Sequence, residues 1–260
     1  MRASHKRFVM SAVLPIALLG SMAAQCGPDN SDPSAATTTP APAGTPVPTA
    51  TAAATGTAGP ATSAAPTGKP GPAKALSSDD LLKALLTKAD VPGTTKSDSG
   101  PAGGDSKTVA DKAACQPVFD LMDATNAATK PAAAVQASFK TGSNVGVMVQ
   151  LYQFGAGQAD KAMSSAAAAL GSCSSIPSTV PGNDNEKLVV STSKLSYPTL
   201  GDATLAFKLS YTGQTTAEYS YVFVRSGDAV INLSNVATAS VTQPDQALVK
   251  KQFDKVKAAQ

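Results

Sequence analysis

Three cysteines carry the most definite chemistry of the sequence: Cys26, Cys115 and Cys173. In an oxidising compartment Cys115 and Cys173 can pair, which leaves Cys26 as the odd thiol. The pair lacks a Cys-x-x-Cys spacing, and no histidine or arginine stands near it in the sequence to lower a thiol pKa. We therefore predict a structural disulfide between Cys115 and Cys173 rather than a redox centre.

The residues before Cys26 are typical of a bacterial lipoprotein signal. Three basic residues precede an apolar stretch over residues 8–19, which is too short to span a bilayer core about 30 Å thick. Small residues then lead to Cys26, as in the lipobox, where the cysteine thiol takes a diacylglycerol and becomes the mature N-terminus. Gln25 departs from this pattern, because Gly, Ala or Ser usually precedes the cysteine.

Two fates of this segment remain open. Cleavage before Cys26 gives a lipoprotein that carries diacylglycerol and palmitate and is anchored to the outer face of the cell membrane. An ordinary secretory cleavage after Ala23 or Ala24 leaves a free thiol instead. The cysteine count favours the lipid, because an unpaired thiol beside a flexible tail would be a liability. We expect residues 1–25 to be the signal peptide and Cys26 to be the lipidation site.

An aromatic row is the first candidate for ligand binding. Tyr211, Tyr219, Tyr221 and Phe223 fall on one face of two neighbouring predicted strands. Such a row could line a groove on an exposed sheet. It could equally be core and cross-strand packing, since aromatic residues are favoured in sheets in any case. The row alone does not distinguish the two interpretations.

Arg225 is the second candidate, as the only arginine after the signal segment. It stands at a hairpin tip close to Asp228, where it could bind an anionic ligand. The alternative is a turn charge that is solvated or paired with the adjacent acid.

Composition excludes several classes of chemistry. The chain has 21 basic and 18 acidic residues, and three of the basic ones lie in residues 1–25, so the processed chain is formally neutral. A neutral chain without a clustered basic face gives no indication of a nucleic-acid partner. The only histidine, His5, leaves with the signal, which excludes Ser-His-Asp catalysis and histidine-bound zinc. We predict no catalytic residues, no metal and no cofactor.

The chain divides into three parts. After the signal, residues 26–75 consist mainly of Ala, Thr, Pro and Gly, which cannot bury enough apolar surface to fold. We interpret this segment as a disordered linker. Residues 76–260 have a globular composition and a length that fits one domain with one core.

Periodicity within that domain predicts an α+β fold, an antiparallel sheet with helices packed mainly on one face. A Gly/Ser/Asp-rich loop is expected between the first two helices, and hairpin turns join most strands. The expected helices cover residues 81–86, 109–124, 158–170 and a segment opened by Asp245. The expected strands cover residues 135–139, 147–154, 188–197, 203–211, 219–225 and 229–236.

The later part of the chain resembles the PknH-like extracellular sensor domain of actinobacterial receptor kinases and lipoproteins. The pieces that carry the resemblance are the opening Leu81-Leu82 to Val91-Pro92-Gly93, the helix bearing Cys115, Val149 to Phe154 leading to the helix that ends at Cys173, Leu200-Gly201-Asp202-Ala203, and Val224 to Asp228. The resemblance implies an antiparallel sheet with helices, a groove on the sheet and an envelope ligand. Those domains often hold two disulfides and tryptophan, whereas this domain can form one disulfide and has no tryptophan.

Three functions are compatible with these features. The first is a non-catalytic binding or sensor module at the cell surface, whose ligand is a lipid, a glycan or an envelope protein. The second is a structural or accessory protein that docks on an envelope partner. The third is a hydrolase that uses only Asp, Glu, Ser or Lys, which the scarcity of glutamates, Glu186 and Glu218, makes the least favoured.

Overall fold

A computed structural model describes residues 74–260, except residues 105–106, 143–144, 182–185, 213–216 and 238–239. The expected signal segment, Cys26 and almost all of the expected linker therefore lie outside the described residues. No helix in the described part is long and apolar enough to cross a membrane.

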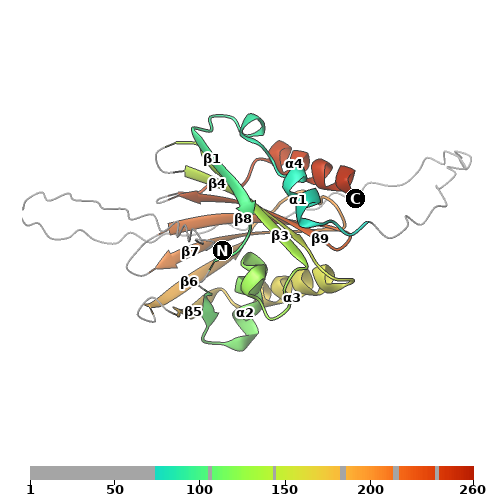
Figure 1. Ribbon diagram of the computed structural model, residues 1–260. Coiled ribbons are helices and arrows are strands. Elements are labelled where there is room, and N and C mark those ends of the chain that lie inside the picture. Colours follow the sequence, from blue (N-terminus) through green and yellow to red (C-terminus); the bar gives the residue numbers. More distant parts are fainter. Residues whose placement is uncertain (1–73, 105–106, 143–144, 182–185, 213–216, 238–239) are drawn as a thin grey trace, which may run out of the picture. The chain divides into compact units, whose positions relative to one another are not determined.

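The described residues form one sheet of nine strands in which every neighbouring pair is antiparallel (Figure 1). Its spatial order is β1-β3-β4-β9-β8-β7-β6-β5-β2, so β8 lies at the centre between β9 and β7. The strands are β1 (Lys96–Pro101), β2 (Val109–Ala110), β3 (Ala133–Lys140), β4 (Val145–Gln153), β5 (Ser175–Val180), β6 (Glu186–Lys194), β7 (Ala203–Thr212), β8 (Ala217–Ser226) and β9 (Ala229–Ala237).

Four α-helices pack on this sheet: α1 (Ser78–Ala84), α2 (Gln116–Met122), α3 (Gln158–Ser172) and α4 (Gln246–Ala259). Three short 3-10 helices complete the described elements: η1 (Lys88–Asp90), η2 (Ala113–Cys115) and η3 (Ala124–Asn126). A capping box between Ser77 and Asp80 starts α1, and the side chain of Asp245 accepts from the N–H of Leu248 to start α4.

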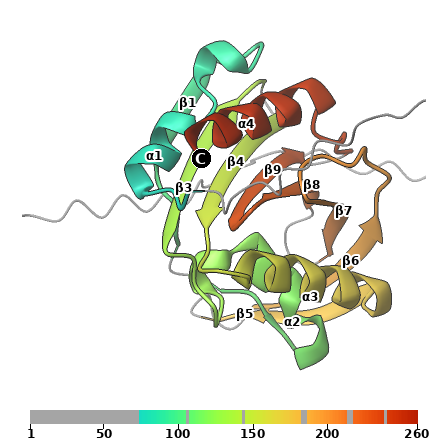
Figure 2. The same cartoon turned by 90° about the vertical axis from the view of Figure 1, so that its right-hand side faces the viewer.

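The α+β class, the antiparallel sheet and the single disulfide are confirmed, but the helices are divided between the two faces. In β8, Val222 and Val224 point to a cluster with α1 and α4, whereas Tyr221 and Phe223 point to a second cluster with α2 and α3. Figure 2 shows the sheet curving around α2 and α3, with α1 and α4 against its outer side. Residues on both sides of β8 and β9 are buried, unlike those of an antiparallel sheet with one solvated face, so both faces of the sheet are covered.

Several predicted boundaries differ from the observed ones. The helix expected over residues 109–124 begins instead as the short strand β2, which pairs with β5, and α2 starts only at Gln116. Pro117 lies in the first turn of α2. A backbone N–H has no helical partner at that position, so the missing N–H of proline costs no hydrogen bond. The expected loop after α1 contains β1, and β5 was not predicted.

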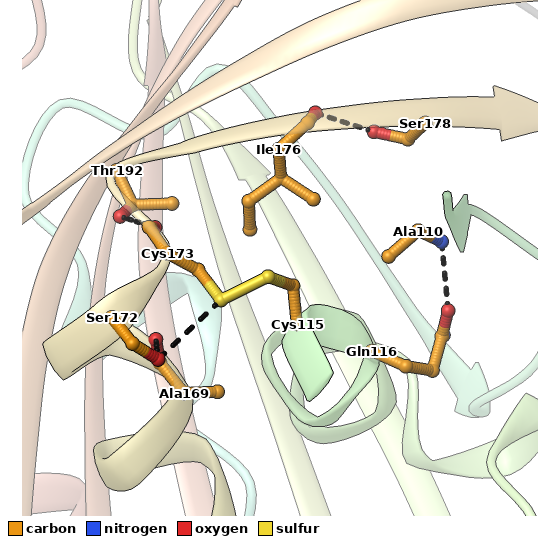
Figure 3. The surroundings of a disulfide bond; sticks show 9 residues. All are labelled: Ala110, Cys115, Gln116, Ala169, Ser172, Cys173, Ile176, Ser178 and Thr192. Carbon is orange, nitrogen blue, oxygen red and sulfur yellow. Dashed lines mark hydrogen bonds between the residues drawn. A yellow bond between two sulfur atoms is a disulfide. The ribbon is translucent and has the colours of Figure 1, made fainter. Parts of the chain in front are cut away.

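The disulfide joins Cys115 to Cys173, with 5.9 Å between their Cα atoms. Cys115 stands just before α2 and Cys173 just after α3, so the bond ties together the two helices of the inner face (Figure 3). Both half-cystines are buried and lie in the cluster that contains Ile176. The bond is therefore part of the core.

Candidate ligand site on the sheet

The aromatic row forms a continuous ladder on the inner face of the sheet. Phe207 of β7 joins the predicted residues and stacks on Tyr221 and Phe223, with ring centroids 5.3 and 5.7 Å apart. Tyr219 stacks on Tyr221 at 5.9 Å, and Tyr211 meets Tyr219 edge to face at 5.3 Å. Cross-strand pairing produces this ladder, because Phe207 lies opposite Tyr221 in the register of β7 and β8.

The structure divides the row into a buried and an accessible part. Phe223 is 0% exposed and Tyr221 is 4% exposed, so both belong to the core that α2 and α3 cover. Tyr211 and Tyr219 are partly exposed at the other end of the ladder. Among the described residues of the ladder, the partly exposed ring surface is at this tyrosine end, Tyr211 with Tyr219.

The two tyrosine hydroxyls are free to donate hydrogen bonds. No hydrogen bond joins either hydroxyl to another residue of the described part. Burial raises the pKa of Tyr219, and burial together with the neighbouring Tyr219 raises the pKa of Tyr211. Both hydroxyls therefore stay protonated at physiological pH and can act as donors and acceptors.

The tyrosine end continues into a partly exposed surface across the sheet. Tyr219 lies opposite Val236 of β9, Val236 opposite Gly146 of β4, and Gly146 opposite Lys140 of β3. Val236 and Gly146 are half-buried and Lys140 is exposed. A ligand on Tyr219 would thus meet apolar surface first and the cation of Lys140, three strands away, last.

A buried amide pair lies deeper on the same face. The Nδ2 of Asn232 donates to Oε1 of Gln150 at 2.8 Å, and Asn232 lies opposite Phe223 in the register. Asn232 is 0% exposed, and its Oδ1 has no hydrogen-bond partner among the described residues. Sequence reasoning missed this pair, because only the strand order brings β4 and β9 together.

Arg225 lies at the opposite end of the ladder and its charge is already compensated. Its guanidinium approaches Asp160 of α3 at 3.3 Å and Asp202 of the β6–β7 connection at 3.5 Å. Asp228, the acid next to it in the sequence, instead accepts a hydrogen bond from the N–H of Gly157 at 2.8 Å. An anionic ligand at Arg225 would have to compete with two carboxylates.

Within the described ranges, no three His, Cys, Asp or Glu side chains gather closely enough to hold a metal ion. What this arrangement offers chemically is binding surface: two half-buried aromatic rings with free hydroxyls on a rigid sheet. The rings can stack on an apolar or sugar surface while the hydroxyls bond its polar groups.

The domain shares its fold with the extracellular domain of a mycobacterial protein. That protein is PknH from Mycobacterium tuberculosis, with a TM-score of 0.54 and 15% sequence identity over 71% of this chain and 98% of the PknH domain. A putative uncharacterized protein from Mycobacterium smegmatis is a more distant match, with a TM-score of 0.38 and 9% identity over 68% of this chain and 96% of the other. No protein-family model matches the sequence, and no curated protein sequence matches it. The predicted resemblance to the PknH-like sensor domain is confirmed as a shared fold.

Proposed function

We propose that this chain is a lipoprotein of the cell membrane whose domain, residues 76–260, is a non-catalytic binding or sensor module for an envelope ligand. The lipid on Cys26 anchors it to the extracytoplasmic face, and the linker over residues 26–75 carries the domain away from the membrane. The basic and apolar segment before Cys26 supports export. The fold shared with a domain described as extracellular supports the same location.

The tyrosine end of the ladder carries the binding part of the proposal. Half-buried tyrosines are suited to recognition, because they offer a rigid apolar ring and a polar tip with little loss of conformational entropy. Tyr211 and Tyr219 provide both, at the accessible end of a ladder whose other end, Tyr221 and Phe223, is buried. A glycan or a lipid with hydroxyl groups fits this combination of stacking surface and free hydroxyls.

A thermal-shift experiment with the full chain tests this site. Envelope lipids and cell-wall glycan fragments are added separately, and the Tm is measured by scanning calorimetry. A ligand at about 100 times its Kd stabilises the domain by about 2.7 kcal/mol. For a domain of this size that corresponds to a rise in Tm of roughly 5–10 °C.

A hydroxyl-deletion pair distinguishes specific binding from general stabilisation. We expect the double variant Tyr211→Phe with Tyr219→Phe to lose most of the ligand-induced shift, while its own fold is retained. Tyr197→Phe is the matched control, because the hydroxyl of Tyr197 bonds the carbonyl of Pro244 away from this site. If no envelope component shifts the Tm, or if the double variant shifts like the control, the proposed site is rejected.

Membrane anchoring is tested separately, at Cys26. Cells expressing the chain are fractionated and the mature protein is analysed by intact mass. The proposal expects acyl mass on the wild-type protein in the membrane fraction, and a Cys26→Ala variant without acyl mass that is released from the membrane. A mature wild-type chain of unmodified mass would show ordinary secretion instead.

A further inference from the structure

A cavity of about 410 Å³ lies on the other face of the sheet, between α1 and the edge strand β1. Ser97 and Ser99 of β1 lie opposite Phe139 and Ala137 of β3, so all four side chains share the face on which α1 packs. The residues that line the cavity are Leu82, Lys83, Leu85, Leu86, Thr87, Lys88, Ser97, Asp98, Ser99, Ala137 and Phe139. Its volume falls within the range of small-molecule sites, about 300–1,000 Å³.

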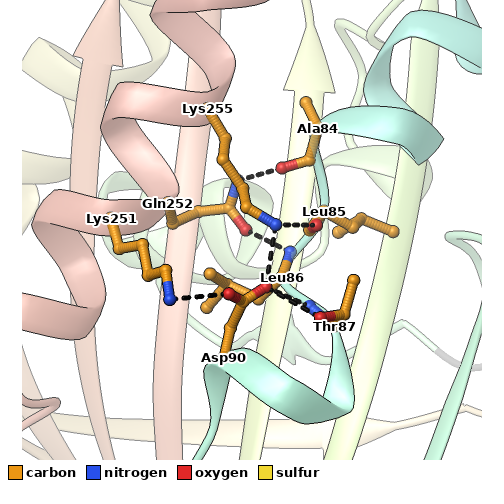
Figure 4. A network of polar contacts seen from close by, with 8 residues as sticks. All are labelled: Ala84, Leu85, Leu86, Thr87, Asp90, Lys251, Gln252 and Lys255. Carbon is orange, nitrogen blue, oxygen red and sulfur yellow. Dashed lines mark hydrogen bonds and ion pairs between the residues drawn. The ribbon is translucent and has the colours of Figure 1, made fainter.

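An ion-pair cluster fixes the helical wall of this cavity. The helical wall of the cavity is the segment from Leu82 to Lys88, and Asp90 follows it at the end of η1. The carboxylate of Asp90 pairs with Lys251 and Lys255 of α4 at 2.7 and 2.8 Å. The same carboxylate accepts from the backbone N–H and the hydroxyl of Thr87 at 2.8 and 2.9 Å (Figure 4). The segment between α1 and η1 is thereby tied to α4.

Gln252 of α4 also binds the backbone of this wall. This side chain is fully buried; its Oε1 accepts from the N–H of Leu86 at 2.9 Å and its Nε2 donates to the carbonyl of Ala84 at 2.8 Å. The Nζ of Lys255 adds a hydrogen bond to the carbonyl of Leu85 at 3.1 Å. Side chains of α4 thus bind one backbone group of each of three consecutive residues, Ala84, Leu85 and Leu86. These contacts within the fold fix the wall of the cavity.

The cavity has an excess of unpaired positive charge. The side chains of Lys83 and Lys88 form no ion pair or hydrogen bond with any other described residue. The one acid in the lining, Asp98, lies 3.5 Å from Lys96. The hydroxyls of Ser97 and Ser99 also make no hydrogen bond within the described part. Two cations and two hydroxyls thus line one cavity without side-chain partners among the described residues.

We propose that this α1–β1 cavity binds a phosphate ester. Lys83 and Lys88 neutralise its charge, and the hydroxyls of Ser97 and Ser99 bond its oxygens. A phosphomonoester carries a charge of about −1.5 to −2 at pH 7, which matches the charge of two lysines. A ligand with a single carboxylate would carry only one negative charge. Lysine binds phosphate as a point charge, so no arginine is required. The phosphomonoester comes either from a soluble sugar or polyol phosphate or from the headgroup of a phosphatidic acid. The site is independent of the tyrosine end, which lies on the opposite face.

Calorimetric titration of the full chain tests the cavity with two probes at about 20 mM salt, where charge interactions are weakly screened. Glycerol phosphate represents the soluble source, and vesicles of phosphatidic acid in phosphatidylcholine represent the headgroup. We expect the pair Lys83→Gln with Lys88→Gln to weaken binding at least tenfold. We expect Ser97→Phe, which fills the cavity without changing charge, to abolish binding.

Lys112→Gln with Lys130→Gln is the matched control, because the side chains of these exposed lysines also lack partners among the described residues and lie outside the cavity. The control pair should stay within twofold of the wild type. Binding of glycerol phosphate with this pattern assigns a soluble ligand, and binding of the vesicles alone with the same pattern assigns a headgroup. Binding of neither probe, or equal weakening by the cavity pair and the control pair, overturns the proposal.

Discussion

Asp90→Asn is the substitution for which the structure gives the sharpest expectation. The side chain of Asp90 is 11% exposed and accepts four hydrogen bonds, two of them from lysines. Hydrogen bonds to charged groups contribute about 1.5–3 kcal/mol, but Lys251 is 53% exposed, so its share is reduced by solvent to less than about 1 kcal/mol. The amide keeps one acceptor oxygen and turns a donor toward the lysines. We expect a loss of about 2–3 kcal/mol at pH 7.

The pH dependence separates lost charge from lost packing. Burial alone would raise the pKa of Asp90, but the hydrogen bonds from Lys251, Lys255 and Thr87 outweigh it and hold the pKa well below its usual value. Since the folded pKa lies below the unfolded value of about 3.9, the carboxylate contributes its full stability above about pH 5. That contribution is lost as the pH falls from about 4 toward the folded pKa. The wild type and the variant should therefore converge in acid.

Urea unfolding at pH 7, 5, 3 and 2.5 measures this convergence. Asp254→Asn is the control, because its ion pair with Lys250 on the same helix is exposed and should contribute no more than about 0.5 kcal/mol. A difference between wild type and Asp90→Asn that stays constant from pH 7 to pH 2.5 would contradict the charge argument. So would a loss at pH 7 no larger than that of the control.

Three further perturbations follow from single contacts. Replacing Cys115 and Cys173 with Ala opens a loop with a sequence separation of 58, and calorimetry should show a loss of about 4 kcal/mol by the loop-closure relation. Gly201→Ala should cost more than about 2 kcal/mol in urea unfolding, because φ is +63° and a Cβ would lie 2.3 Å from the carbonyl oxygen of Arg225. Gln252→Leu should cost about 2–4 kcal/mol and accelerate hydrogen exchange in the α1 segment, because it leaves two buried backbone groups unpaired.

The sequence predicts the strands in which apolar residues alternate. It misses a polar strand that forms only because a neighbouring strand offers an edge to pair with. The central strands β7, β8 and β9 lie almost where the sequence predicts them, because each has large apolar residues at alternate positions. The edge strand β1 has the sequence Lys-Ser-Asp-Ser-Gly-Pro and is almost entirely exposed, so it carries no period-two signal. It is a strand because β3 presents a free edge, which is a tertiary property that no local window contains.

The candidate sites show the same limit more sharply. Period two correctly places Tyr219, Tyr221 and Phe223 on one face, but it cannot say which part of that face a helix will cover. Lys83 and Ser97 are ordinary surface residues in the sequence, and only the pairing of β1 with β3 brings them to one cavity. Side-chain direction is local information, whereas cover and enclosure depend on contacts between distant elements.

Arg225, which the sequence offers for binding, is instead engaged by contacts within the fold. Its guanidinium links Asp160 of α3 to Asp202 of the β6–β7 connection, and its carbonyl accepts from the N–H of Asp202 at 2.9 Å. A ligand anion would gain this cation only by releasing two carboxylates, so its net gain in charge interaction would be small. Anion recognition is therefore better placed at Lys83 and Lys88, whose charges the described fold leaves uncompensated.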